Sequence, residues 1–495
     1  MQGLTGAAPV QTHISAVFIG AETVFKLRKA VRLAFVDFTT LAERERTARR
    51  ELELNADNAP GLYRDVVPVM RRPDGTLALG DDGIVVDWPV VDWPVVDWLV
   101  RMARVAPGDF LDEVAGRGGL TPGLLDAMAD AVVALHARNP VVARDQAVAL
   151  RGVAEGNAVA ARQAGLDAAK VDAWLGETMA WLTRQADALR GRGAAGLVRR
   201  AHGDLHLGNM CMWRGVPVAF DALEFDENLA TIDVGYDLAF LLMDLDVRVD
   251  RAAANRVMNR YLARTGDWAL VAFLPVWQSM RAMVRAHVEA ARGHDEEARR
   301  YLDRALGYLR PVAACVVAVG GLPGSGKSTV ARALAPGLGA APGAVILRSD
   351  EIRKRRFGVA PEQRLPAAGY TAAVSRGVFG EISAAAGMIA AGGHAVVVDA
   401  TFMDSGHRAG IAAAAGTLPF LGAWLDVPMD ELERRVAART GDASDADLGV
   451  LRSAAPAGIG AGIGAGIGAG SWLAVDGADT ATATAEILAT LATRA

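Results

Sequence analysis

Eight residues, Gly321–Ser328, constrain this chain more than any other segment. They read Gly-Leu-Pro-Gly-Ser-Gly-Lys-Ser, after an apolar run at Ala314–Val319 and before a stretch of helical character at Thr329–Leu334. Glycines let a backbone curl so that consecutive N–H groups point at phosphate oxygens, and the N-terminus of the following helix adds partial positive charge. The segment is therefore predicted to be a phosphate-binding loop between a strand and a helix.

The polar side chains of this loop have predicted partners. Lys327 would reach the β- and γ-phosphates of a nucleoside triphosphate, and the hydroxyl of Ser328 would bind Mg²⁺. This part of the chain is therefore expected to bind ATP together with Mg²⁺. The remaining nucleotide contacts are predicted from the other residues of the loop and its exit: Gly321, Pro323, Gly324, Ser325, Gly326 and Thr329.

Length and charge restrict the class of protein. A chain of 495 residues is long enough for two or three domains. Its net charge of −5 provides no global basic field, which argues against nucleic acid as a partner. Two cysteines in different parts of the chain favour a reducing compartment. No leader-like segment and no apolar run of about 18 residues is present, so we expect a cytoplasmic protein with no membrane partner.

The first part of the chain mixes strands and helices. Two alternating runs, 13–19 and 23–28, predict a hairpin, and 66–70 predicts another strand. A charged helix is predicted over Leu41–Asn55, where Leu41, Ala48, Leu52 and Leu54 would form a loose apolar stripe. Helical periods then dominate from Phe110 to Arg199 and from about Asp233 to Leu309.

Pro311 marks a predicted boundary between a domain at 1–310 and a second domain at 311–495. The second part alternates strand and helix, which is typical of a parallel sheet with helices on both faces. Two tandem repeats interrupt the chain: Val-Val-Asp-Trp-Pro from Val85, and Ala-Gly-Ile-Gly over Ala457–Gly470. We interpret both as slippage products in tolerant loops, because neither period matches a known repeat fold.

A second group of chemistry-bearing residues precedes the boundary. Asp204 is followed by Asn209 and, after a short predicted strand, by Asp221. Kinases of the eukaryotic type use this layout: the first Asp orients the attacking hydroxyl, and the Asn and second Asp hold Mg²⁺ on the phosphates. The alternative, a polar turn with a capping Asp, does not explain why these three residues occur together at these intervals.

In these residues the chain resembles the aminoglycoside phosphotransferase and choline kinase-like group, and more closely the bacterial proteins that fuse such a domain to a P-loop kinase. The resemblance implies a bilobal, protein-kinase-like α+β domain followed by an α/β P-loop kinase domain. It extends over nearly the whole chain. The segments that carry it are Thr12–Ser15, Val24–Lys29, His202–Asn209, Phe220–Phe225, Asp233 with Asp237–Phe240, and the C-terminal motifs.

The resemblance also implies a nucleotide site in the first domain. Lys26 would pair with the phosphates and Glu51 would hold Lys26, although Arg28 and Lys29 compete with the first and Glu45 and Glu53 with the second. The segment Trp98–Met102 would form the hinge strand behind the adenine, with Met102 among the nucleotide contacts. The chain departs from the pattern because no Gly-x-Gly-x-x-Gly joins the first two strands, which leaves a pseudokinase reading open.

Beyond the phosphate-binding loop, the segment from Arg348 to Lys354 follows a predicted strand at Val345–Leu347. In P-loop kinases an Asp at this place faces the acceptor hydroxyl, so Asp350 is the candidate base and Arg353 a candidate phosphate or substrate contact. The alternative is that Ser349 or Asp350 only caps a helix beginning near Glu351.

Further acidic and basic residues complete the predicted second site. Asp399 ends a buried strand at the position where P-loop kinases organise Mg²⁺. Arg435 and Arg439 lie on a helix from Asp430 that resembles the family's lid, whose arginines close on phosphates; Arg434 competes with them. Arg408 is either a substrate contact or a surface residue.

Together these patterns predict an ATP-dependent phosphotransferase with two kinase domains acting on hydroxyl groups of small-molecule acceptors. Two alternatives remain. The C-terminal part could phosphorylate the 5′-hydroxyl of a polynucleotide, or the N-terminal part could be a nucleotide sensor that regulates the other. The sequence identifies neither the acceptor nor the oligomeric state.

Overall fold

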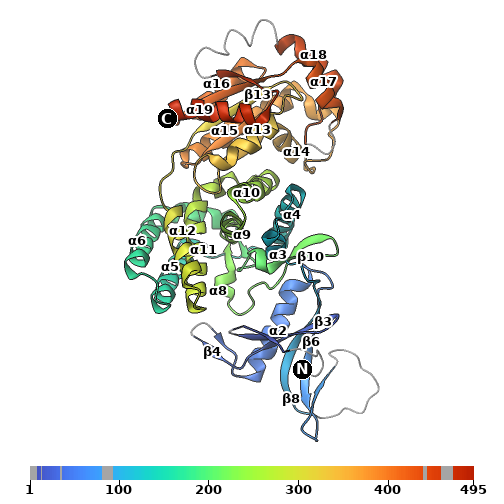
Figure 1. Cartoon of the computed structure of the whole chain (residues 1–495), viewed down its shortest axis with the longest axis vertical. Coiled ribbons are helices and arrows are strands. Elements are labelled where there is room, and N and C mark those ends of the chain that lie inside the picture. The colour runs from blue at the N-terminus through green and yellow to red at the C-terminus, as the bar shows by residue number, and fades with distance from the viewer. Residues whose placement is uncertain are drawn as a thin grey trace. The chain divides into compact units, whose positions relative to one another are not determined.

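The computed structural model of the chain forms two compact units (Figure 1). Unit 1 consists of Met1–Gly156 and Met179–Asp244, and unit 2 of Asn157–Thr178 and Leu245–Ala495. The residues that the structure describes are 8–12, 14–33, 36–80, 93–438, 443–458 and 472–494.

Unit 1 begins with a six-stranded antiparallel sheet, in the order β1-β2-β3-β8-β6-β7. The predicted hairpin is confirmed, because β2 and β3 pair in antiparallel register from Ser15 opposite Arg28 to Ile19 opposite Val24. The third copy of the five-residue repeat lies in β8. The strands are β1 Val10–Gln11, β2 Ser15–Ile19, β3 Thr23–Arg28, β6 Tyr63–Arg71, β7 Leu77–Leu79 and β8 Val95–Ala103, with a separate pair β4 Arg32–Leu33 and β5 Val36–Asp37.

The predicted charged helix is present as α2, Leu41–Ala56, and it packs on β6 and β8. Its buried face is different from the predicted apolar stripe. The buried residues are mostly polar, because several of them pair with charged or backbone groups elsewhere in unit 1. They are Arg44, Thr47, Ala48, Glu51 and Asn55, so that only Ala48 of the predicted stripe is buried.

The rest of unit 1 is mainly helical, with a two-stranded ribbon that carries the Asp204 to Asp221 segment. Strands β10 and β11 pair from Met210 opposite Ala219 to Trp213 opposite Val216. The elements are α3 Leu111–Gly116, α4 Pro122–Arg138, α5 Gln146–Gln163, α6 Ala168–Arg184, α7 Ala186–Ala194, β9 Val198–Arg200, η1 Leu207–Asn209, β10 Met210–Trp213, β11 Val216–Ala219, α8 Glu227–Ala230, β12 Thr231–Asp233 and α9 Val234–Arg248; the division between the units falls within α5, α6 and α9.

Unit 2 contains a helical part and a five-stranded sheet. Its sheet is parallel, in the order β14-β15-β13-β16-β17, as predicted. The elements are α10 Arg251–Thr265, η2 Trp268–Phe273, α11 Leu274–Ala291, α12 Asp295–Tyr308, β13 Val316–Gly321, α13 Lys327–Leu334, η3 Ala335–Gly337, β14 Val345–Arg348, α14 Ser349–Arg356, η4 Ala367–Tyr370, α15 Ala372–Ala391, β15 Val396–Asp399, α16 Ser405–Ala414, β16 Phe420–Asp426, α17 Met429–Ala438, α18 Leu448–Gly458, β17 Trp472–Asp476 and α19 Thr480–Arg494.

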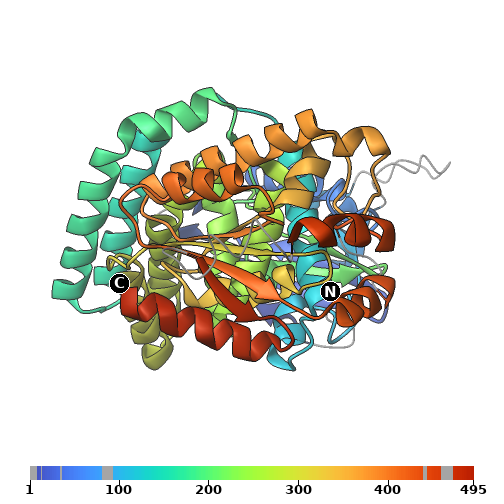
Figure 2. The same cartoon turned by 90° about the horizontal axis from the view of Figure 1, so that it is seen from above.

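Helices lie on both sides of this sheet, as its apolar strands require (Figure 2). On one side, α13 and α19 join the strands in one core that includes Val319, Leu334, Leu421 and Ile487. Helices α15 and α16 pack against each other and against β15 and β16, respectively. The phosphate-binding loop and the end of β15 therefore meet at the carboxyl edge of the sheet.

Strand β14 is an edge strand, and α10 covers its open side. The side chain of Asn259 replaces a neighbouring strand: its amide donates to the carbonyl of Ala344 at 3.2 Å, and its oxygen accepts from the N–H of Ile346 at 2.6 Å. Asn255 also donates to the carbonyl of Ala344, at 3.0 Å. This arrangement satisfies backbone groups that an edge strand would otherwise leave unpaired.

Replacing Asn259 with alanine is expected to lower the free energy of unfolding by about 1–3 kcal/mol, because two backbone groups near the edge of β14 would lose a partner. Urea unfolding of the purified chain measures the change. Gln163→Ala, at an exposed position of the same unit, is the control and should unfold like the wild type. An unchanged urea midpoint for Asn259→Ala would show that the hydrogen bonds of Asn259 do not stabilise the edge strand β14.

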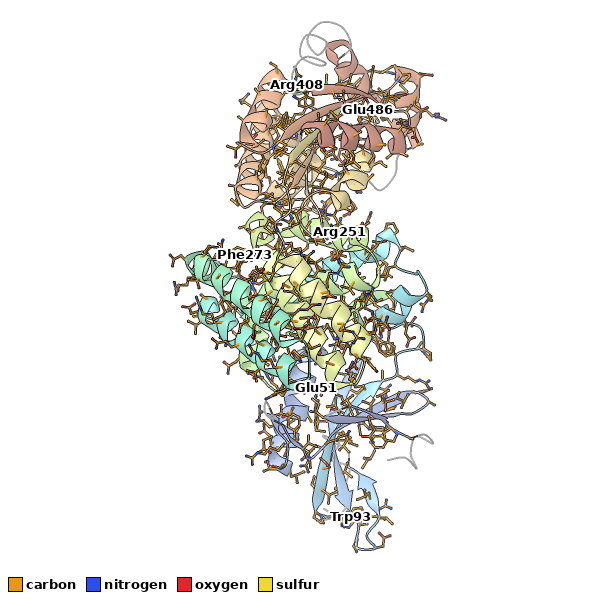
Figure 3. The ribbon with its side chains drawn as sticks, turned by 60° about the vertical axis from the view of Figure 1, so that its left-hand side comes forward. Glu51, Trp93, Arg251, Phe273, Arg408 and Glu486 are labelled. Carbon is orange, nitrogen blue, oxygen red and sulfur yellow. The ribbon has the colours of Figure 1, made fainter. Side chains whose placement is uncertain are left out.

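Three expectations fall wholly or partly outside the described residues. These are His13 at the start of the first run, the first copy and most of the second copy of the five-residue repeat, and most of the Ala-Gly-Ile-Gly repeat, whose first two residues end α18. Trp93, labelled in Figure 3, is described, and the guanidinium of Arg72 lies 5.5 Å from its ring centroid. Among the described residues, no helix is both long and apolar enough to cross a membrane.

Candidate functional site

A cluster of charged residues in unit 1 contains the predicted lysine and glutamate. Lys26 on β3 donates from Nζ to Oε1 of Glu51 at 2.8 Å, and it also forms an ion pair with Asp221. Glu51, labelled in Figure 3, is completely buried and comes from the polar face of α2. The structure thus brings together three predicted residues that lie up to 195 positions apart.

The competing residues have other partners. Lys29 bonds the carbonyl of Thr12, Glu45 pairs with Arg49, and Glu53 pairs with Arg50. Arg28 does not replace Lys26 but joins the same cluster, where it pairs with both Glu51 and Glu224. The cluster therefore holds two cations and three carboxylates.

The charges of this cluster stabilise one another. Burial and the neighbouring Arg28 act to lower the pKa of Lys26, but Asp221, Glu51 and Glu224 outweigh them and raise it. Burial acts to raise the pKa of Asp221, but Lys26 and Arg28 outweigh it and the pKa is lowered. Lys26 is therefore held as a cation and Asp221 as a carboxylate. Burial raises the pKa of Glu224 to about 7 despite the opposing effect of Arg28.

Asp221 has an unusual backbone conformation, with φ at 60°. Non-glycine residues seldom occupy this left-handed region, and they persist there where surrounding contacts fix them. The N–H of Asp221 donates to the hydroxyl of Tyr63 at 3.0 Å, and the N–H of Ala222 donates to Oδ1 of Asn55 at 3.0 Å. The sheet and the polar face of α2 thus fix the direction of the Asp221 side chain.

Asp204 lies on the loop before β10 and its side chain is 40% exposed. The amide of Asn209 donates to Oδ2 of Asp204 at 2.9 Å and to its carbonyl oxygen at 2.9 Å. Nε2 of His206 lies 3.5 Å from the same carboxylate oxygen. The loop therefore presents a carboxylate to solvent in an orientation that Asn209 fixes.

The buried carboxylate of Asp237 anchors the backbone at the start of this loop. Oδ2 of Asp237 accepts from the N–H of His202 at 3.0 Å, and Oδ1 accepts from the N–H of Gly203 at 2.9 Å. Nε2 of His136 lies 3.2 Å from the same Oδ2, and Nε2 of His202 lies 2.9 Å from the carbonyl oxygen of Phe220. Because Asp237 fixes the loop backbone, Asp204 itself is not needed to shape it.

The ribbon β10–β11 brings Asn209 close to the Asp221 segment. Asn209 immediately precedes β10, and the N–H of Phe220 donates to its carbonyl at 3.0 Å. One amide oxygen and one partly exposed carboxylate fit a hard cation such as Mg²⁺. The carboxylates of Glu51, Asp221 and Glu224 also lie within 4.8 Å of one another, but each already forms an ion pair with Lys26 or Arg28.

Met102, the remaining unit 1 residue of the predicted nucleotide site, lies near the end of β8. It pairs in register with Val24 on β3 and Tyr63 on β6, and it packs against the core cluster formed by α2, β6 and β8. The predicted hinge segment Trp98–Met102 is thus a central strand of the sheet.

In unit 2, the phosphate-binding loop joins β13 to α13 as predicted. Gly326, at φ 87°, precedes the first turn of α13, and a Cβ on Gly321 would lie 2.6 Å from Oγ of Ser325. These two positions require glycine. Lys327 Nζ donates to the carbonyl of Leu322 at 2.8 Å and lies 3.5 Å from Oγ of Ser325, so its ammonium lies over the loop.

The loop lines a cavity of about 1030 Å³. Ser328 and Asp399 meet in it, since Oγ of Ser328 donates to Oδ2 of Asp399 at 2.5 Å. A hydroxyl and a carboxylate fit Mg²⁺. Further predicted residues that line the cavity are Pro323, Gly324, Gly326, Lys327, Thr329, Asp350, Arg353 and Arg435.

Asp350 lies in the first turn of α14, which begins at Ser349 rather than near Glu351. The alternative that Ser349 or Asp350 caps this helix is wrong. The N-cap residue is Arg348, and no side-chain hydrogen bond caps the N-terminus of α14. Burial raises the pKa of Asp350, although Arg348, Lys327 and a hydrogen bond with Ser444 oppose the shift; the nearby Asp399 reinforces it. Asp350 is thus a partly buried carboxyl of increased basicity at the wall of the cavity.

The predicted arginines of this region have different surroundings. Arg435 lines the cavity and donates to the carbonyls of Gly477 and Ala478, at 3.2 and 2.8 Å, whereas Arg434 is 76% exposed and pairs with Glu431. Arg408, labelled in Figure 3, is buried and donates to the carbonyl of Phe402, so the surface alternative is wrong. It is not among the described residues that line the cavity. Arg439 lies outside the described residues.

Sequence reasoning missed several residues of the two sites. Arg348 is the first residue of the segment that contains Asp350 but was given no role, and Glu224 follows Asp221 by three positions. Lys354 is fully buried and pairs with Asp445 at 3.0 Å, which ties the segment before α18 to α14. For Arg348 and Glu224, the available signal was a charged residue within three positions of a predicted site residue. No local pattern indicates the role of Lys354.

Comparisons with known proteins match two separate segments of the chain. Residues 100–274 match the family described as the phosphotransferase enzyme family, and residues 316–455 match the family described as an AAA domain. An uncharacterized protein of Mycobacterium tuberculosis, strain H37Rv, is 29% identical over 462 residues, covering 88% of this chain and 87% of its own length. An uncharacterized protein of Mycobacterium bovis matches with the same identity and coverage.

Two solved structures are also similar in part. A gluconokinase from Sinorhizobium meliloti covers 37% of this chain and 94% of its own, with 24% identity and a TM-score of 0.27. A thermostable mutant of an aminoglycoside phosphotransferase covers 61% of this chain and 93% of its own, with 14% identity and a TM-score of 0.39. Two separate segments of the chain thus match known families: residues 100–274 match the phosphotransferase enzyme family, and residues 316–455, which contain the phosphate-binding loop, match the AAA domain family.

Proposed function

We propose that this protein is an ATP-dependent phosphotransferase with two active sites, each of which transfers a phosphoryl group to the hydroxyl of a small molecule. We place the functional boundary near residue 310, giving a kinase-like domain at 1–310 and a P-loop kinase domain at 311–495. The proposal rests on the composition of two separate sites. Each site contains a lysine that would contact the phosphates, oxygen atoms that would bind Mg²⁺ and a carboxylate that would accept the proton of the acceptor hydroxyl.

In the first site, Lys26 would contact the phosphates while Glu51 holds it, and Asn209 and Asp221 would hold Mg²⁺. Bound Mg²⁺ would neutralise charge that develops on the phosphates. Asp204 would orient the acceptor hydroxyl and accept its proton. Its exposure and its hydrogen bond from Asn209 support this role, because the base must reach a substrate from a fixed position.

In the second site, the N–H groups of the phosphate-binding loop and Lys327 would hold the triphosphate, with Ser328 and Asp399 as metal ligands. Asp350 would take the proton of the acceptor hydroxyl, and Arg435, with Arg439 beyond the described residues, would neutralise the transferred group. The position of Asp350 and Arg353 on the wall of the same cavity as Lys327 supports an acceptor site next to the nucleotide.

The balance of charge favours a small-molecule acceptor over a polynucleotide. The net charge is −5, and the arginines at the second cavity have protein partners such as Gly369 for Arg353 and Asp447 for Arg364. A sensor role for the first domain is disfavoured because Asp204, Asn209 and Asp221 are all present, and nucleotide binding alone would not need the acceptor-side Asp204.

Counting bound nucleotides tests the two-site proposal. The full chain should bind about two molecules of a fluorescent ATP analogue in the presence of Mg²⁺, and Lys26→Met and Lys327→Ala should each remove one. Lys29→Met is the matched control, since the ammonium of Lys29 bonds the carbonyl of Thr12 rather than the cluster. Stoichiometry near one in the wild type would contradict the proposal.

The pH dependence of the second reaction is expected to follow Asp350. A base must be deprotonated, so kcat/KM should fall as the pH decreases through its pKa, which burial places above the ordinary value of 3.8. Ser444→Ala removes a hydrogen bond that lowers this pKa and should move the acid limb to higher pH. A pH–rate profile of both proteins measures the shift, and coincident profiles would show that another group titrates.

A further inference from the structure

Arg348 occupies the centre of the second predicted metal site. It is the last residue of β14 and lies opposite Asp399, the last residue of the parallel neighbour β15. Its Nε donates to Oδ2 of Asp399 at 3.0 Å, and Nη2 donates to Oγ of Ser328 at 2.9 Å. The guanidinium therefore bonds both residues that are expected to hold Mg²⁺.

The same guanidinium reaches the acceptor side of the site. Nη1 of Arg348 donates to Oε1 of Glu351 at 3.0 Å, one residue after Asp350 in the first turn of α14. The side chains of Arg348 and Asp399 are only 5% and 7% exposed. Arg348 thus links the phosphate-binding loop, the end of β15 and the helix that carries the candidate base.

A buried carboxylate such as Asp399 requires a nearby positive charge. Arg348 provides that charge within the protein. A divalent cation on Ser328 and Asp399 would face the guanidinium at short range, and two positive charges near one carboxylate repel each other strongly in a buried site. The negative charges of a triphosphate would compensate for the second cation.

We propose that Arg348 is a positioning residue whose positive charge balances the Asp399 carboxylate when no metal is bound. Because of this charge, Mg²⁺ would bind at Ser328 and Asp399 only together with the nucleotide. The inference rests on the proposed function, because it takes Ser328 and Asp399 as the metal ligands of the second site. It predicts that the protein without nucleotide has little affinity for free divalent cations at this site.

Binding of Mn²⁺ to the nucleotide-free full chain, measured by electron paramagnetic resonance, tests the proposal. All proteins would carry Asp221→Asn, which weakens the metal site of the first domain. Arg348→Met, which removes the charge but keeps much of the length, should bind Mn²⁺ at least about tenfold more tightly than the parent. Adding Asp399→Asn should abolish the gain, and Arg348→Lys, which keeps a positive charge, should stay close to the parent.

Equal Mn²⁺ affinity of the parent and Arg348→Met would overturn the proposal. If Arg348→Met does not fold, Arg348→Gln, which keeps hydrogen-bonding capacity without the charge, provides the same comparison. Binding of an ATP analogue with Mg²⁺ to the parent distinguishes a failure of the proposed function from a failure of the role of Arg348. Failure of nucleotide binding that depends on Lys327 would refute the proposed function, whereas normal nucleotide binding with unchanged Mn²⁺ affinity would refute only the role of Arg348.

Discussion

Replacing Asp350 with asparagine is expected to lower kcat of the second reaction by about 10²–10⁴-fold, the usual contribution of a general base. The substitution keeps the shape of the side chain but removes the carboxylate that would accept the acceptor's proton. ATP affinity should change little, because in the proposed site Lys327, Ser328 and Asp399, not Asp350, would contact the nucleotide and the metal. Steady-state kinetics together with a binding measurement separate the two effects.

Asp404→Asn is the matched control for this prediction. Asp404 is exposed and caps α16, where it accepts from the N–H of His407 at 3.1 Å. Asparagine caps helices about as well as aspartate, so the replacement should leave kcat within about twofold of the wild type. Comparable activity of Asp350→Asn and Asp404→Asn would show that Asp350 is not the base.

Replacing Asp204 with asparagine is expected to lower kcat of the first reaction by a similar factor of about 10²–10⁴. The loop should keep its structure because Asp237, not Asp204, accepts the backbone N–H groups of His202 and Gly203. The amide of Asn209 would still find an acceptor in the new side chain. Circular dichroism and thermal unfolding should therefore match the wild type while transfer is lost.

Asp226→Asn is the control in the same unit. Asp226 caps α8, where it accepts from the N–H groups of Asn228 and Leu229, and asparagine caps helices about as well as aspartate. Its replacement should preserve both stability and transfer. Wild-type kcat for Asp204→Asn would mean that the first domain uses another base or does not transfer phosphate.

Local patterns predicted most of the fold. The phosphate-binding loop, the parallel sheet and the first hairpin each depend on short stretches of sequence, so their residues could be read directly. The orientation of α2 could not, because its buried face is polar. Glu51 and Asn55 are buried through contacts with Lys26 and with the segment after Asp221, and periodicity of apolar residues does not register such partners.

The sites show the same limit. Asp204, Asn209 and Asp221 are recognisable from their spacing, but the ion pair between Lys26 and Asp221 joins residues 195 positions apart and was not predicted. The family resemblance implied only the contact between Lys26 and Glu51. Ser444 and Asp445 contact Asp350 and Lys354 of α14, and the sequence alone did not predict either contact. Arg348 was not assigned a role because a cation beside two metal ligands becomes visible only once β14 and β15 are in register.

Transfer of label from γ-labelled ATP tests the central claim, that one chain carries two independent phosphotransferase sites. The full chain, Asp204→Ala and Asp350→Ala would each be incubated with a panel of aminoglycosides, sugars, nucleosides and 5′-hydroxyl oligonucleotides. The account predicts that the wild type labels acceptors of two kinds and that each substitution abolishes labelling of only one kind. If one substitution abolishes all labelling and the other changes none, the chain has a single phosphotransferase site and the claim is wrong.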